Sequence, residues 1–312
     1  MVMNWSGAQP VRIMIEVGEV REAIAVDVYK PDTGNGPAPS IILVTGGAGK
    51  DLRSGDDTTR GKSAVGTHDL AAVLASEGYW AFVPSRRGDP AWTYKDWEVL
   101  PERFRARMPR ALCDGNAGNN GTHTHLRQVE ELHALQSWMQ ASNIAGLDAS
   151  RIGIFARSAG CGIALRHAAS VGKSIRAMFF WGAALRTSQW FLGPKSDEYF
   201  NRVLTSRGIC VDRQEFCRGL CDAIDWVGAI SIPLAFGCAD WDGYAPVKSE
   251  RDPWTGPEEQ IQLLRYSLNA RDAIVIIVKG AEHTMYLEHP TWTAYSTAII
   301  SWFREKLPVI TI

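Results

Sequence analysis

Three residues far apart in the chain carry the side chains that nucleophilic acyl transfer requires. Ser158 lies in the run RIGIFARSAGCGIA, Asp240 follows the apolar run IPLAFG, and His283 follows AIVIIVK. A serine hydroxyl is a weak nucleophile near neutral pH, so it needs a base within hydrogen-bond reach and a third group that orients the base. These residue types therefore predict a serine nucleophile, an orienting carboxylate and a histidine base.

The sequence around Ser158 has the features of a nucleophile elbow. Residues 152–155 form a short apolar run typical of a buried strand, and a pattern with helical spacing follows the serine. Ala156 and Gly160 lie two residues before and two residues after Ser158. An elbow strains the backbone of its serine and accepts only small side chains at these two positions, because the strand and the helix nearly touch. We therefore predict that Ser158 lies at the apex of such a turn.

Strands alternate with helices along most of the chain. Apolar runs predict strands over residues 40–45, 79–84, 152–155, 175–181, 232–237 and 273–278, after two antiparallel strands over 11–17 and 23–29. Amphipathic spacing predicts helices over residues 67–77, 122–141, 257–267 and 290–307. This alternation predicts an α/β fold with a mostly parallel, doubly wound sheet. Functional groups in such a sheet gather at the carboxyl ends of the strands, which places Ser158, Asp240 and His283 along one edge.

One long segment interrupts the alternation. Residues 182–230 contain two stretches typical of short helices with no strand between them. We interpret residues 184–230 as a helical cap inserted into a single domain that spans residues 1–312. Three residues are candidates to line an apolar pocket: Trp190 in this segment, and Trp241 and Met285 beside the proposed acid and base. The alternative is that they pack the cap against the main domain.

Composition excludes several classes of function. The 312 residues are 46% hydrophobic and 21% charged, enough for one large core. A net charge of −1 leaves no electrostatic footprint for nucleic acid or an anionic membrane. No apolar run reaches the roughly 18 residues of a transmembrane helix, and the start of the chain lacks signal-peptide features. The expected location is cytoplasmic, and scattered cysteines that stay reduced fit it.

Several segments together resemble the α/β-hydrolase superfamily. GCAD after one strand and GAEH after the next, preceded by the elbow, are similar to that family's acid, base and nucleophile segments. LVTGGAGKD resembles its oxyanion loop, and GYWAFVPSRRGD resembles a segment of its esterase and peptidase-like members. The resemblance covers about residues 10–307 and is nearest to the esterase, dienelactone-hydrolase and acyl-peptidase-like group. The chain departs from the family at Thr45, where many members have histidine, and at Ala156, where glycine is common.

The resemblance implies a role for each residue of the triad. Ser158 would attack the substrate carbonyl, and His283 would accept the serine proton and later deliver it to the leaving group. Asp240 would hold the imidazole tautomer and stabilise the imidazolium. Asp242, two residues further on, is the alternative acid if the turn after the strand runs one step longer.

The resemblance also implies an oxyanion hole. One donor would be the backbone N–H of Ala159, at the start of the helix behind the serine. The second would come from the loop after the strand over residues 40–45, with Gly47 as the first choice and Ala48 as the next.

The expected activity is hydrolysis of carboxylic esters of small apolar or aromatic substrates through an acyl-enzyme, with water as the second substrate. No cofactor is implied, and no metal site is predicted because His123 and His125 lack a partnered carboxylate motif. The expected partner is a small-molecule ester, with monomer and homodimer both open. Peptidase or amidase activity, lactone or carbon–carbon bond hydrolysis, and a non-catalytic ligand-binding role are the alternatives.

Overall fold

The fold is built on one mixed sheet. The computed structural model describes residues 10–17, 22–31, 36–46, 61–84, 125–188, 219–240, 255–283, 285, 287 and 289–310. Within these ranges eight strands form a sheet in the order β1-β2-β4-β3-β5-β6-β7-β8. The strands are β1 (Val11–Val17), β2 (Glu22–Tyr29), β3 (Ala38–Val44), β4 (Trp80–Pro84), β5 (Leu147–Arg157), β6 (Ile175–Trp181), β7 (Leu234–Ala239) and β8 (Ala273–Val278).

The sheet is mostly parallel, as the alternation of elements predicts. β1 pairs with β2 and β2 pairs with β4 in antiparallel fashion, while every other neighbouring pair is parallel. Strands in the middle of a parallel sheet are covered on both faces, so their sequences are apolar throughout. β3, β4 and β7 show this most fully, because each of their residues is buried.

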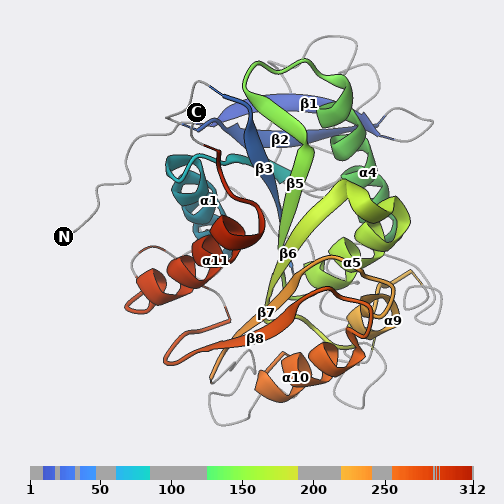
Figure 1. The fold of residues 1–312 in the computed structure, drawn as a ribbon, viewed down its shortest axis with the longest axis vertical. Coiled ribbons are helices and arrows are strands. Elements are labelled where there is room, and N and C mark those ends of the chain that lie inside the picture. Colours follow the sequence, from blue (N-terminus) through green and yellow to red (C-terminus); the bar gives the residue numbers. More distant parts are fainter. Residues whose placement is uncertain are drawn as a thin grey trace.

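Helices cover both faces of the sheet. They are α1 (Gly61–Ser76), α4 (His125–Ala141), α5 (Gly160–Val171), the short 3₁₀ helix η2 (Gly172–Ser174), α9 (Ala223–Val227), α10 (Pro257–Tyr266) and α11 (Trp292–Lys306). Figure 1 shows α1 and α11 on one side of the sheet, and α4, α5, α9 and α10 on the other. Each side has its own apolar core.

Most elements differ from their predicted bounds by one to three residues, and β5 begins at Leu147 rather than at residue 152. Two of the differences have a plain physical reason. α1 begins at Gly61 rather than at residue 67. The sequence does not predict these first turns, because residues 61–66 are mostly small or polar and show no apolar spacing. β7 continues through Ala239 rather than ending at Gly237, since Gly237 packs against the rings of Phe179 and Trp181 within the sheet. The glycine therefore marks a close approach of neighbouring strands and not the end of one.

A pair of histidines, the buried His167 and the partly exposed His133, joins α4 to α5 and predicts a pH dependence of stability. The His167 Nε2–H donates to Gln136 Oε1 at 2.8 Å, and the His133 ring centroid lies 4.7 Å from that of His167. Burial, and secondarily the charge of His133, lower the pKa of His167 to about 3. Between pH 6.5 and 3 the unfolded chain therefore binds a proton at His167 that the folded chain does not, so stability falls as the pH falls.

When the pH is lowered from 7.5 to 5, we expect proton binding at His167 in the unfolded chain to lower the free energy of unfolding by about 2 kcal/mol. Urea unfolding of the wild type and of His167→Gln at both pH values measures this, because the glutamine cannot titrate. The wild type should lose more stability than the variant over this interval. Equal losses of unfolding free energy in the two proteins would contradict a His167 that stays neutral in the folded protein.

Candidate active site

Ser158 occupies a strained turn between a strand and a helix. β5 ends at Arg157 and α5 begins at Gly160, so only Ser158 and Ala159 connect them. Ser158 has a φ of 54°, and among the described residues it is the one non-glycine residue with a positive φ. A side chain with a Cβ is disfavoured in this left-handed conformation, which persists only where the surroundings enforce it and is concentrated at functional sites.

Two glycines allow the end of β3 to pack directly against this turn. A Cβ at Gly160 would lie 2.7 Å from the carbonyl oxygen of Thr45. A Cβ at Gly46 would lie 2.4 Å from both the Ser158 Cβ and the Arg157 carbonyl oxygen. The loop that follows β3 therefore starts in contact with the serine. The sequence gives the glycine run but not this contact, because only the folded chain brings residues 46 and 158 together.

Asp240 lies directly after β7 and is tied to the segment after β8. Its backbone N–H donates to the Val278 carbonyl at 3.3 Å, and its Oδ1 accepts a hydrogen bond of 2.7 Å from the Gly280 N–H. Gly280 lies three residues before His283. The Asp240 carboxylate is thus held beside the loop that carries the histidine.

His283 is buried, with 6% of its surface exposed, in a loop that is anchored at several points. The Trp181 indole Nε1–H donates to the His283 carbonyl at 3.2 Å and to the Glu282 carbonyl at 3.3 Å. Further along, the Leu287 N–H donates to Asp69 Oδ2 of α1 at 3.1 Å. The loop is therefore fastened to β6 on one side and to α1 on the other.

The three predicted residues follow strands of one parallel block of the sheet. β5, β6, β7 and β8 run parallel and side by side (Figure 1). Ser158 follows β5, Asp240 follows β7 and His283 follows β8, with β6 between the first two strands. The register pairs Arg157 with Trp181, so the serine follows the paired end of its strand. Carboxyl ends of parallel strands share one edge, so the three residues lie at the same edge of the sheet.

The other predicted site residues divide into two groups. Ala159 immediately precedes α5, and Met285 is buried, with its Sδ accepting a hydrogen bond from the Glu282 N–H at 3.4 Å. Five further positions lie outside the described residues: Gly47, Ala48, Trp190, Trp241 and the alternative acid Asp242. Of the cap over residues 184–230, the structure describes 184–188 and 219–230, so the cap and these pocket and oxyanion assignments stay predictions.

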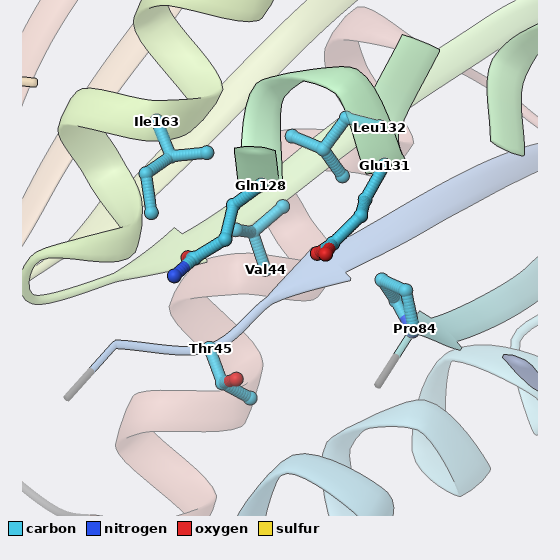
Figure 2. Close-up of a pocket in the computed structure, with 7 residues that line it drawn as sticks. All are labelled: Val44, Thr45, Pro84, Gln128, Glu131, Leu132 and Ile163. Atoms are coloured by element: carbon cyan, nitrogen blue, oxygen red, sulfur yellow. The ribbon is translucent and has the colours of Figure 1, made fainter. Parts of the chain in front are cut away.

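A small cavity lies beside the end of β3, under α4 and α5 (Figure 2). Its volume is about 20 Å³, enough for one water molecule and too small for an acyl chain. Gln128 and Glu131 bring buried polar groups to it, and Gln128 Oε1 has no hydrogen-bond partner within the described part of the chain. The lining residues are Val44, Thr45, Pro84, Gln128, Glu131, Leu132 and Ile163. Sequence periodicity marks α4 as amphipathic but does not reveal these polar residues on its buried side.

The described residues include no candidate metal site. Across the described ranges no three histidine, cysteine, aspartate or glutamate side chains gather in a way that could hold a metal ion. His125 instead accepts a hydrogen bond from the Cys221 N–H at its Nδ1, at 2.8 Å. None of the helices in these ranges is long and apolar enough to cross a membrane.

No family model and no curated protein matches the sequence, but many solved structures match the fold. The acylaminoacyl peptidase of Pyrococcus horikoshii matches over 96% of this chain and 42% of its own, with a TM-score of 0.62 and 13% identity. A puromycin hydrolase matches over 97% of this chain and 40% of its own, with a TM-score of 0.65 and 14% identity. The dienelactone hydrolase of Anabaena variabilis matches over 96% of this chain and 99% of its own, with a TM-score of 0.55 and 16% identity.

The chain spans less than half of the length of the two larger enzymes and nearly all of the dienelactone hydrolase. At such low identities the likeness concerns the fold, while the chemistry has to be argued from the residues at the sheet edge.

Proposed function

We propose that this chain, which has the α/β-hydrolase fold, is a serine hydrolase that acts through an acyl-enzyme. The observation that carries the proposal is the φ of 54° at Ser158, in a two-residue turn between a parallel strand and a helix. Strain of this kind has to be maintained by the surrounding structure, and in hydrolases it presents the nucleophile at the top of the sheet. Ser158 itself is 6% exposed.

The reaction follows from the three residues at the sheet edge. Ser158 Oγ attacks the substrate carbonyl carbon while His283 takes the hydroxyl proton, giving a tetrahedral oxyanion. The oxyanion collapses, the bond to the leaving group breaks, and His283 donates its proton to the departing oxygen. Water then attacks the acyl-enzyme by the same steps and releases the acid and free Ser158. Asp240 orients the imidazole and stabilises its charged form.

Backbone N–H groups around Ser158 would stabilise the oxyanion. The Ala159 N–H lies at the N-terminal end of α5, where backbone N–H groups lack helical partners and the helix dipole favours negative charge. The second donor is proposed at Gly47 or Ala48, and the contact of Gly46 with the Ser158 Cβ supports this choice because the loop begins against the serine. Loss of one such donor typically costs about 100-fold or more in rate.

The proposed substrates are carboxylic esters with small apolar or aromatic groups. The second candidate is amide or peptide hydrolysis, which uses the same residues and is favoured by the likeness to an acylaminoacyl peptidase and a puromycin hydrolase. A p-nitrophenyl ester and the p-nitroanilide of the same acyl group separate the two. Because the ester is intrinsically the more reactive substrate, turnover of the anilide decides. Hydrolysis of the ester without measurable hydrolysis of the anilide supports esterase activity, and efficient hydrolysis of the anilide supports the peptidase alternative.

Gly46 offers a test of the contact between the loop after β3 and the elbow. A methyl group at this position would lie within 2.4 Å of the Ser158 Cβ, so the loop or the serine has to move. We expect Gly46→Ala to lower kcat by about 100-fold, the loss that a displacement of 1 Å in an active site can produce.

The matched control for Gly46→Ala is Gly228→Ala. A Cβ at Gly228 would meet the Tyr266 carbonyl oxygen at an ordinary 3.4 Å, and Gly228 has a helical φ of −66°. Steady-state kinetics on both variants make the comparison. Wild-type kcat in Gly46→Ala would contradict the close packing on which the proposed oxyanion loop depends.

A further inference from the structure

We infer that Trp181 is a positioning residue that fixes the segment of the nucleophile and the segment of the base relative to each other. The inference rests on the proposed function, because it concerns that reaction's Ser158 and His283. Trp181 is the last residue of β6, between β5 and β7, and its side chain is fully buried. Its backbone contacts one of the two segments, and its side chain contacts the other.

The backbone carbonyl of Trp181 holds the nucleophile. It accepts a hydrogen bond of 3.0 Å from the Ser158 N–H. Arg157 and Trp181 are register partners, so this bond extends the β5–β6 ladder by one residue beyond the end of β5. The strained serine is therefore attached to β6 through its own main chain.

The indole of Trp181 holds the base. Its Nε1–H is shared between the carbonyl oxygens of His283, at 3.2 Å, and Glu282, at 3.3 Å. To reach the segment after β8 from β6, the ring has to cross β7. Gly237 of β7 leaves room for it, since a Cβ there would lie 2.9 Å from the Trp181 Cε3.

The ring has little freedom to follow a moving loop. Tyr295 of α11 packs edge-on against it, with ring centroids 4.7 Å apart and an interplanar angle of 84°. An indole N–H is a donor only, and leaving a buried donor unpaired is costly. Displacement of the His283 backbone would break the shared bond inside the core, so Trp181 restrains the distance between base and nucleophile.

Trp181→Phe tests the inference, because it keeps a buried aromatic ring and removes the donor. It also removes part of the volume of the indole, and a tryptophan-to-phenylalanine control corrects for that loss. The matched control is Trp302→Phe: Trp302 is 3% exposed, and its Nε1 has no hydrogen-bond partner within the described residues. We expect Trp181→Phe to lower kcat by up to about 100-fold with KM unchanged. The rate of labelling by a fluorophosphonate should fall by the same factor, and Trp302→Phe should match the wild type in both measurements.

A double-mutant cycle separates positioning from a general structural role. If Trp181 acts through His283, Trp181→Phe costs no further rate in a His283→Ala background. An undiminished loss in that background would overturn the inference, and so would equal rates in Trp181→Phe and Trp302→Phe. Hydrogen exchange of the Trp181 indole proton in the wild type is an independent check. Slow exchange is expected, and exchange as fast as in a solvated indole would overturn the inference even if the variant fails to fold.

These outcomes remain distinct from failure of the proposed function. A wild-type protein that neither hydrolyses esters or anilides nor reacts with a fluorophosphonate removes the proposed function and this inference with it. A wild type that reacts, with a Trp181→Phe variant that reacts equally fast, removes the inference alone.

Discussion

Ser158→Ala is expected to reduce kcat for ester hydrolysis by about 10⁶-fold, the loss seen when a triad nucleophile is removed. The variant lacks the attacking oxygen, so only the oxyanion donors and substrate binding remain to accelerate attack by water. Ser150→Ala, at an exposed serine that bonds Asp148, is the control and should leave kcat unchanged. Initial rates with a p-nitrophenyl ester measure both. A loss of less than tenfold in Ser158→Ala would mean that another group is the nucleophile.

A second substitution at the same position tests the strain. Ser158→Gly should lose the same activity, yet its free energy of unfolding should exceed that of Ser158→Ala by about 1 kcal/mol, because glycine adopts a positive φ without a steric penalty. Urea unfolding of the two variants gives the difference. Equal stabilities would contradict a strained backbone at Ser158.

Asp240→Asn is expected to lower kcat by about 10⁴-fold while the fold is kept, because an amide stabilises the wrong imidazole tautomer. Asp242→Asn should have little effect. The hydrogen bond from the Gly280 N–H to Asp240 Oδ1 favours this assignment, since it holds the carboxylate beside the loop of His283.

The two asparagine variants form a matched pair for steady-state kinetics and circular dichroism. A large loss in Asp242→Asn with a mild one in Asp240→Asn would transfer the role of the acid to Asp242. Large losses in both, with both proteins folded, would mean that the two carboxylates share the role.

Much of the fold was predictable because its strands are mostly apolar. β6, inside the sheet, and β8, at its edge, have the predicted bounds, and every residue of β6 except Arg176 is buried. The start of α1 was not predictable, since residues 61–66 carry no apolar spacing. The end of β7 was missed because glycine in a strand sequence marks either a turn or a close approach, and at Gly237 it marks a close approach.

For the candidate site, chain order and strand ends were enough to bring Ser158, Asp240 and His283 to one edge of the sheet. The contacts that hold them there were not predictable, because they join segments far apart in the chain. Gly46 packs against Ser158, and the Trp181 indole donates to the His283 carbonyl. In each pair the two residues are more than a hundred positions apart in the sequence. Sequence patterns indicate which face of a helix or strand is buried, but not which residues of other segments contact that face.

A fluorophosphonate reacts with activated serines whatever the substrate, so it probes Ser158 without knowledge of the natural ester. Intact-mass analysis after incubation of the wild type and of Ser158→Ala with this probe compares the two proteins. If Ser158 is the activated nucleophile, the wild type carries a single adduct and the variant carries none. An adduct on both proteins, or on neither, would contradict the assignment of Ser158.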